Sequence, residues 1–160
     1  MKENIIKFFR SFKYAAAGLA ACVRRERNMR FHLCAGVTAL WLGGFYELSG
    51  GEKCALFIVI ALVIAAEAVN TAVEAAVDIS GERSPMAGLA KDCAAGAVLV
   101  CAAGAVCCGI VLFWDRVVFR EIFLYFRRNI FACIMAAGWV IFSVYFIFGM
   151  SCKQVDQKKN

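Results

Sequence analysis

Four long apolar runs, separated by shorter polar or glycine-rich stretches, organise this chain. They cover about residues 31–48, 54–79, 91–114 and 129–149. Each run is close to the roughly 20 helical residues that cross a bilayer core of about 30 Å. The segment before them, residues 1–27, mixes basic and aromatic side chains, as does a helix that lies on a membrane surface. The pattern predicts an all-α integral membrane protein with an N-terminal amphipathic surface helix and four transmembrane helices.

The fourth apolar run conflicts with the charge of the loop before it. If all four runs cross the membrane, both termini are cytoplasmic and the arginines of residues 115–128 lie outside. Basic loops, however, usually stay on the cytoplasmic side. A helix over residues 117–126 that lies flat on the surface, with its arginine side chains reaching the headgroups, reduces this conflict. We therefore keep four crossings, with this surface helix as one interpretation of the segment between the last two.

The second run carries a stripe of polar side chains. At about 100° per residue on a helix, the stripe is roughly 100° wide and faces away from hydrocarbon side chains such as Val69 and Val73. A carboxylate at the centre of a membrane helix costs about 2.5–3.5 kcal/mol by insertion measurements, so it usually faces a partner or a watery cavity. The stripe therefore indicates the catalytic wall of a membrane enzyme. Its members are Glu67, Asn70, Thr71, Glu74 and Asp78.

Composition and charge agree with a membrane protein. The chain has 160 residues, of which 62% are hydrophobic, and a net charge of +6. Much of the positive charge lies in the first thirty residues among aromatic side chains, which favours an anionic membrane surface and argues against a nucleic-acid partner. The nine cysteines include no CxxC pair, and most lie in apolar runs, so we expect free thiols.

Phosphoryl transfer is the chemistry that this arrangement permits. It needs magnesium, a group that orients or deprotonates the acceptor, and cations that hold the phosphates. Magnesium takes one or two protein carboxylates, which Glu74 and Glu26 would supply. Glu67, deeper in the same stripe, would act as general base on a lipid hydroxyl, and Lys91 would hold phosphates. The G-x-x-x-x-G-K-[ST] motif of common soluble nucleotide-binding proteins is absent from the sequence.

The stripe also belongs to a longer gapped motif. The segment from Glu67 to Asp78, followed by Ala90-Lys91-Asp92 and a helix of small residues, resembles the bacterial diacylglycerol kinase/undecaprenol kinase family of small integral membrane kinases. The upstream segments 11–15 and 26–30 resemble the undecaprenol kinase branch. The resemblance covers about residues 7–114. We therefore expect a lipid kinase domain at residues 1–114 and an extension at 115–160, with the fourth transmembrane helix and a polar tail.

The resemblance implies a fold, a reaction and a location. Such enzymes are homotrimers in which each subunit has a surface helix and three transmembrane helices, and neighbouring subunits share active sites. They transfer the γ-phosphate of ATP, with Mg²⁺, to a lipid alcohol on the cytoplasmic side of the bacterial inner membrane. The resemblance also assigns site residues. Glu67 would be the base, Glu26 and Glu74 would bind Mg²⁺, Asn70, Lys91 and Asp92 would line the nucleotide site, and Lys13 and Tyr14 would lie near the adenine.

Other interpretations remain open at this point. The acceptor is undecaprenol or diacylglycerol, and the N-terminal segments favour undecaprenol. Glu26 has an alternative role as an i,i+4 partner of Arg30, and Asn70 as an interhelical hydrogen-bonding residue. A transporter or proton pathway with Glu67 and Glu74 as a relay is an alternative of another class. The first and fourth runs carry few polar residues, which disfavours that transporter hypothesis.

Overall fold

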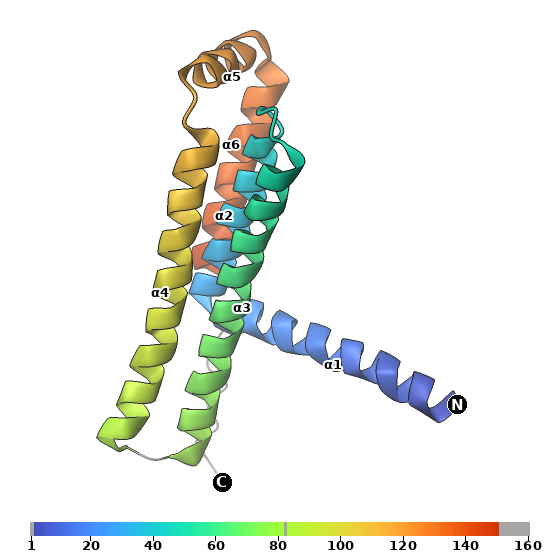
Figure 1. Cartoon of the computed structure of the whole chain (residues 1–160), viewed down its shortest axis with the longest axis vertical. Coiled ribbons are helices and arrows are strands. Elements are labelled where there is room, and N and C mark those ends of the chain that lie inside the picture. The colour runs from blue at the N-terminus through green and yellow to red at the C-terminus, as the bar shows by residue number, and fades with distance from the viewer. Residues whose placement is uncertain (1, 82, 151–160) are drawn as a thin grey trace.

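The computed structural model describes residues 2–81 and 83–150, and within them every regular element is a helix (Figure 1). Six α-helices are followed by one π-helical turn. Their bounds are α1 Lys2–Arg25, α2 Arg27–Gly43, α3 Gly50–Ser80, α4 Pro85–Phe113, α5 Arg116–Arg128, α6 Ile130–Val144 and η1 Tyr145–Gly149. The expectation of an all-helical protein is confirmed.

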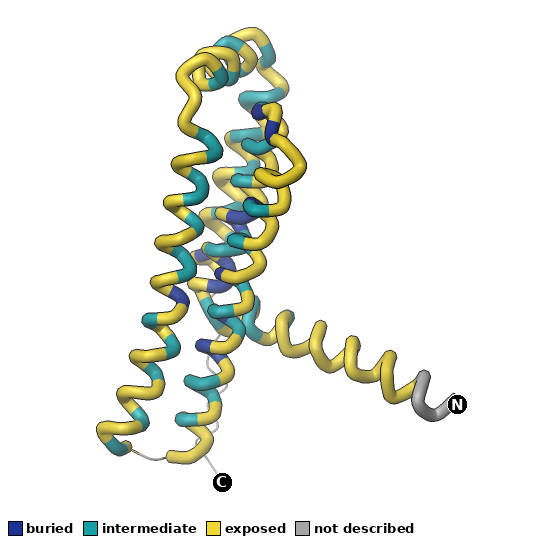
Figure 2. The backbone as a smooth tube through the Cα atoms, viewed as in Figure 1, coloured by how far each residue is buried: buried dark blue, intermediate teal, exposed yellow. Residues whose placement is uncertain are grey.

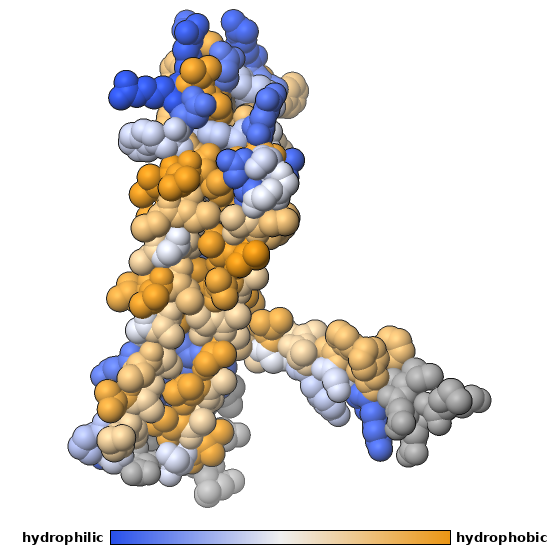
Figure 3. Space-filling model, in the orientation of Figure 1, coloured by the Kyte–Doolittle hydropathy of each residue, from blue (hydrophilic) through white to orange (hydrophobic). Residues whose placement is uncertain are grey.

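The long helices form an upright bundle from which α1 projects sideways (Figure 1). The bundle contains α2, α3, α4 and α6, and α5 lies across its far end. Side chains 6–19 of α1 are all exposed, so this helix contacts the bundle through its C-terminal part (Figure 2). An apolar belt covers the middle of the bundle, with hydrophilic side chains gathered at both ends (Figure 3). This distribution fits a bundle that crosses a membrane.

Local capping signals fix several helix ends. The side chain of Ser49 accepts a hydrogen bond from the main chain of Glu52, and Glu52 reciprocates, which forms a capping box at the start of α3. α3 ends at Gly81, whose φ of 66° lies in the left-handed region that glycine adopts most easily. Ser84 caps α4, with Pro85 in its first turn. Each such cap typically contributes about 1 kcal/mol.

Within residues 2–81 and 83–150, three helical segments are long and apolar enough to cross a membrane: Gly50–Ser80, Pro85–Phe113 and Ile130–Gly149. The C-terminal transmembrane helix predicted beyond residue 129 is among them. The first predicted run is different, because α2 has 17 residues and ends at Gly43 instead of reaching residue 48. Residues beyond Gly43 fold back, so that Tyr46 and Leu48 pack against Leu56 of α3. Because the chain folds back here, α2 is shorter than the helix that the hydrophobic pattern predicts.

One further helix boundary differs from the prediction. α4 begins at Pro85, so Lys91 and Asp92 lie in its second turn and do not open the helix. Ser84 and Pro85 are strong start signals, and they outweigh the change from polar to apolar residues. A helix, α5, does lie between the last two runs, and its place on the membrane surface stays a prediction. The predicted polar tail falls at residues 151–160, outside the part of the chain that the structure describes.

Candidate active site

The polar stripe of α3 runs from the interior of the bundle to its surface. Glu67 is 1% exposed, and Asn70 and Thr71 are also buried. One turn further on, Glu74 is half-buried, and Asp78 is exposed. The opposite face behaves as predicted, since Val69 is 61% exposed. The helix therefore brings a buried carboxylate and a wetter carboxylate onto one face.

Hydrogen bonds within α3 fix part of this stripe. The Asn70 side chain donates from Nδ2 to Oε1 of Glu74 over 2.9 Å. The Thr71 hydroxyl donates to the main-chain oxygen of Glu67 over 2.9 Å, and not to its carboxylate. Oδ1 of Asn70 is buried and has no hydrogen-bond partner among the described residues. Buried acceptors are normally satisfied, so this oxygen is suited to a donor or cation from outside the chain.

Glu26 joins the stripe from a different element. It is the extended residue between α1 and α2, with φ −103° and ψ 120°. It occupies the N-cap position of α2, but its side chain caps no main-chain N–H. The two helices that Glu26 joins both pack against α3, which carries Glu67 and Glu74. The fold therefore brings the segment that holds Glu26 to the helix that carries the other two glutamates.

The side-chain oxygen atoms of this candidate site are of the kind that binds magnesium. Carboxylate oxygens from Glu26 and Glu74, with the unpartnered amide oxygen of Asn70, are the hard donors that this ion prefers. No group of three or more His, Cys, Asp or Glu side chains within the described residues is arranged to hold a metal by itself. A protein cage is not required, however, because magnesium usually keeps water and phosphate oxygens in its coordination shell. The residues present fit a magnesium ion that arrives with a nucleotide.

Lys91 and Asp78 form an ion pair across the hairpin of α3 and α4. Lys91 Nζ lies 2.6 Å from Asp78 Oδ1, and it is the one salt bridge found among the described residues. No role for Asp78 was predicted, although the two residues flank a short connection where such a pair is favourable. Lys91 also borders an open surface hollow with Arg83 and Ser84. Asp92, one position further along, is exposed.

Lys13 and Tyr14 are not brought to the stripe within one chain. Both lie on the exposed part of α1, and Tyr14 is 71% exposed. Since α1 points away from the bundle, these side chains are free to face another molecule (Figure 1).

Arg30 is the residue whose importance the sequence did not reveal. It is 4% exposed, and its guanidinium donates to the main-chain oxygens of Val23, Arg24 and Ile147. It forms no ion pair with Glu26, so the predicted i,i+4 alternative for that carboxylate is wrong. In the sequence, Arg30 is one of several basic residues in a cluster, and nothing there distinguishes it as the buried one.

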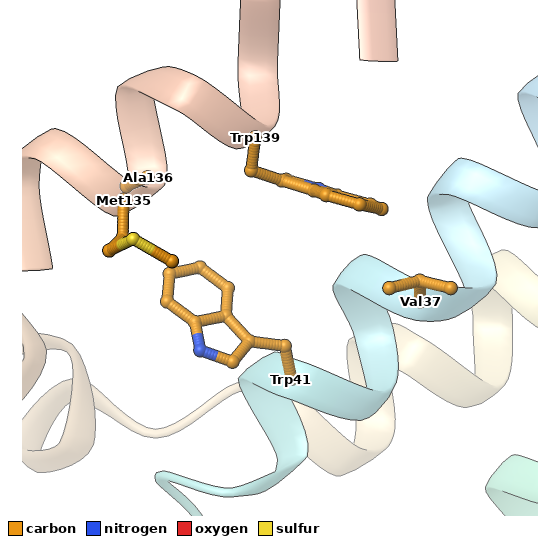
Figure 4. A pocket seen from close by; sticks show the side chains of 5 residues that line it. All are labelled: Val37, Trp41, Met135, Ala136 and Trp139. Atoms are coloured by element: carbon orange, nitrogen blue, oxygen red, sulfur yellow. The ribbon is translucent and has the colours of Figure 1, made fainter. Parts of the chain in front are cut away.

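An apolar pocket lies away from these polar groups, between α2 and α6. Val37, Trp41, Met135, Ala136 and Trp139 line it (Figure 4). The indole of Trp139 donates to the hydroxyl of Thr38 over 3.0 Å beside this pocket. The hydrocarbon lining holds no acid, base or nucleophile, so the candidate active site remains on α3 and at the α1–α2 joint.

Comparison with known proteins decides the chemistry of this site. The sequence profile described as prokaryotic diacylglycerol kinase matches residues 13–113. The chain belongs to the prokaryotic diacylglycerol kinase family. Members of this family are lipid kinases, so the protein is an ATP-using membrane lipid kinase. The transporter hypothesis is thereby set aside.

The individual relatives are named for two different lipid substrates, undecaprenol and diacylglycerol. This lipid kinase is 38% identical over 116 residues to the undecaprenol kinase of Bacillus subtilis (strain 168), covering 72% of this chain and 94% of that enzyme. It is 39% identical over 101 residues to a diacylglycerol kinase of Synechocystis, covering 62% of this chain and 58% of that enzyme. A diacylglycerol kinase of Pseudomonas aeruginosa is 33% identical over 88 residues, covering 54% of this chain and 72% of that enzyme. No solved structure matches the chain.

Proposed function

We propose that this lipid kinase phosphorylates undecaprenol, with ATP as phosphoryl donor, at the cytoplasmic face of a bacterial inner membrane. The observation that carries the proposal is the burial of Glu67 beside the hydrogen-bonded pair of Asn70 and Glu74, in a chain that belongs to a lipid kinase family. The similarity to the Bacillus undecaprenol kinase covers nearly all of that enzyme, which supports undecaprenol as the acceptor.

In the proposed reaction, Glu67 accepts the proton of the lipid hydroxyl. The hydroxyl oxygen forms a bond to the γ-phosphorus of ATP while the bond from that phosphorus to the β–γ bridging oxygen breaks. The products are the lipid phosphate, ADP and a proton. Burial within an apolar bundle suits Glu67 to this role, because an alcohol whose tail stays in the membrane presents its hydroxyl near that depth.

The remaining site residues would hold the nucleotide. Glu26 and Glu74 supply carboxylate oxygens for Mg²⁺, which when bound neutralises charge on the phosphates. Asn70 orients Glu74 through its 2.9 Å hydrogen bond. Lys91, which a carboxylate partner already aligns, is suited to contact phosphate oxygens. Asp92 completes the nucleotide site in this proposal.

A homotrimer with shared sites is part of the proposal. Lys13 and Tyr14 are exposed on a projecting helix, so they would reach the adenine of a nucleotide held by a neighbouring subunit. On α4, added Cβ atoms at Gly96 and Gly104 would meet no atom within 4 Å, which leaves room for a close helix from another chain. Crosslinking in membranes, followed by mass determination, tests this assembly.

Diacylglycerol is the second candidate acceptor, because two of the relatives carry that name. Purified protein in lipid nanodiscs is given radiolabelled ATP, Mg²⁺ and equal membrane fractions of undecaprenol or diacylglycerol. We expect kcat/KM for undecaprenol to exceed that for diacylglycerol by at least about tenfold, a difference of about 1.4 kcal/mol in transition-state binding. A preference for diacylglycerol would reverse the assignment, and turnover of neither lipid would contradict the proposed reaction.

A further inference from the structure

The C-terminal extension reaches the joint between α1 and α2 at Arg30. Nη1 of Arg30 donates to the main-chain oxygens of Val23 over 3.0 Å and Arg24 over 3.1 Å. On its other side, Nη2 and Nε donate to the main-chain oxygen of Ile147 over 3.1 and 3.4 Å. One buried guanidinium therefore connects the end of α1, the start of α2 and the extension.

The chain offers these carbonyl groups because they lie at helix ends. The last carbonyls of an α-helix lack partners within the helix, and Val23 and Arg24 are in the last turn of α1. Ile147 lies in η1, a π-helical turn at the end of α6, where main-chain carbonyls also lack partners within the helix. The planar fork of an arginine presents several N–H groups in fixed directions and can satisfy both sets together. A lysine, with one compact ammonium group, cannot.

Glu26 lies at the vertex of this joint. Its main-chain N–H donates to Cys22 over 2.8 Å, and its main-chain oxygen accepts from the N–H of Arg30 over 3.4 Å. Its side chain caps neither helix. The place of its backbone, and with it the region that its carboxylate can reach, therefore depends on the angle between α1 and α2, across which Arg30 forms its hydrogen bonds.

A second contact joins the extension to the joint between α1 and α2. The guanidinium of Arg27, directly after Glu26, lies 5.8 Å from the centre of the Phe148 ring. Ile147 itself is buried against the bundle. The family profile ends at residue 113, so Ile147 and Phe148 come from a part of the chain that the profile does not match.

We infer that Arg30 and the Ile147 turn of the extension together position the Glu26 carboxylate for metal binding. The extension is then a working part of the kinase, and Arg30 is a positioning residue for the reaction. This inference rests on the proposed role of Glu26 as a magnesium ligand. The experiments below separate the failure of one from the failure of the other.

The direct readout is metal affinity, measured on the full chain in nanodiscs without turnover. Mn²⁺ replaces Mg²⁺, a nonhydrolysable ATP analogue is present, and electron paramagnetic resonance counts bound Mn²⁺. We expect Arg30→Lys to weaken Mn²⁺ binding about tenfold, in the range known for residues that orient metal ligands. In the activity assay, the Mg²⁺ concentration for half-maximal rate should rise by a similar factor, while KM for the lipid stays within about twofold.

A second variant approaches the joint from the extension and leaves Arg30 in place. A Cβ added at Gly149 would lie 2.7 Å from the Tyr145 ring, so Gly149→Ala must displace the η1 turn or that ring. We expect weaker Mn²⁺ binding in the same direction as for Arg30→Lys. Removal of the ring in Tyr145→Ala/Gly149→Ala should restore the affinity. Tyr145→Ala alone should bind Mn²⁺ normally, because this side chain is 66% exposed. If Arg30→Lys fails to fold, this series still decides the question.

Trp139→Phe is the matched control for general loosening of the extension. It removes the hydrogen bond from Trp139 to Thr38, roughly 12 Å along α6 from Ile147. It should lower the melting temperature without changing Mn²⁺ affinity. If Trp139→Phe weakens Mn²⁺ binding as much as Arg30→Lys does, the effect is purely structural and the inference is wrong.

Glu26→Gln separates the two proposals. Weaker Mn²⁺ binding in Glu26→Gln, with normal binding in both Arg30→Lys and Gly149→Ala, would overturn the positioning inference and leave the proposed function intact. Normal Mn²⁺ binding in Glu26→Gln would instead remove Glu26 from the metal site, and the positioning inference with it.

Discussion

The side-chain amide of Asn70 donates a 2.9 Å hydrogen bond to the carboxylate of Glu74, one helical turn further along α3. The other amide atom, Oδ1, is buried and finds no hydrogen-bond partner in the described part of the chain. The pair therefore offers a fixed carboxylate and a free oxygen acceptor beside the buried Glu67.

Removal of this amide should impair catalysis. Asn70→Leu keeps the branched shape of the side chain but removes the donor to Glu74, and a hydrogen bond to a charged group contributes about 1.5–3 kcal/mol. We expect kcat/KM for ATP to fall by about ten- to a hundredfold. Thr71→Val, which alters the neighbouring buried position, should stay within a few fold of wild type. Equal activity of Asn70→Leu and wild type would show that Glu74 needs no orienting partner.

Glu67 is predicted to be the catalytic base. Glu67→Gln retains the shape of the side chain but cannot accept the proton of the lipid hydroxyl. Turnover should fall by about 10²- to 10⁴-fold, the usual contribution of a general base. Helix content by circular dichroism should not change. Glu47→Gln, an exposed carboxamide substitution in the α2–α3 connection, is the control. Full turnover by Glu67→Gln would remove this residue from the mechanism.

Lys91 and Asp78 should differ in their effects, although they form one ion pair. Both side chains are substantially exposed, at 36% and 62%, so Asp78→Asn should change the free energy of unfolding by less than about 1 kcal/mol. Lys91→Met should raise KM for ATP about tenfold or more, because it removes a charged donor to phosphate. Lys53→Met, at the opposite end of α3, serves as control. An unchanged KM in Lys91→Met would leave this lysine with a structural role alone.

Close packing of α2 on α3 depends on Gly36. A Cβ at this position would lie 3.0 Å from Cγ2 of Ile60, so Gly36→Val should lower the free energy of unfolding by about 1–3 kcal/mol. Gly36→Val/Ile60→Ala should recover part of this loss. Gly18→Val on exposed α1 has no atom near its Cβ and should have little effect on bundle stability. Unfolding in SDS measures all three, and equal stability of Gly36→Val and Gly18→Val would contradict the packing argument.

Stability should fall at high pH because of Tyr46. Burial, with a smaller contribution from the charge of Asp115, raises the pKa of its phenol above the ordinary value of about 10. The unfolded chain then releases this proton at lower pH than the folded chain, so stability is lost as the pH rises from about 10 through the folded pKa. The phenol also donates to the main-chain oxygen of Phe113 over 2.8 Å. Melting curves should show this alkaline loss in wild type and a smaller one in Tyr46→Phe; identical profiles would exclude Tyr46 as its cause.

Much of the fold follows from local patterns in the sequence. The helical period places Glu67, Asn70 and Glu74 on one face, whatever the rest of the chain does. The caps Ser49 and Ser84 also act locally, although the hydrophobic pattern placed the start of the third run at residue 91. The cost of a carboxylate inside an apolar helix likewise singles out Glu67 without any structure. For these reasons the all-helical class and the face of the candidate site were predictable.

The sequence alone determined which helices form and which face of α3 is polar, because both depend on neighbours within one or two turns. Only the tertiary structure decided that α2 ends at Gly43, that Lys91 meets Asp78 and that Arg30 holds Ile147. Arg30 and Ile147 are 117 residues apart in the chain. No periodicity connects such positions, since an arginine binds whichever free carbonyl groups the packing of whole helices brings within its reach.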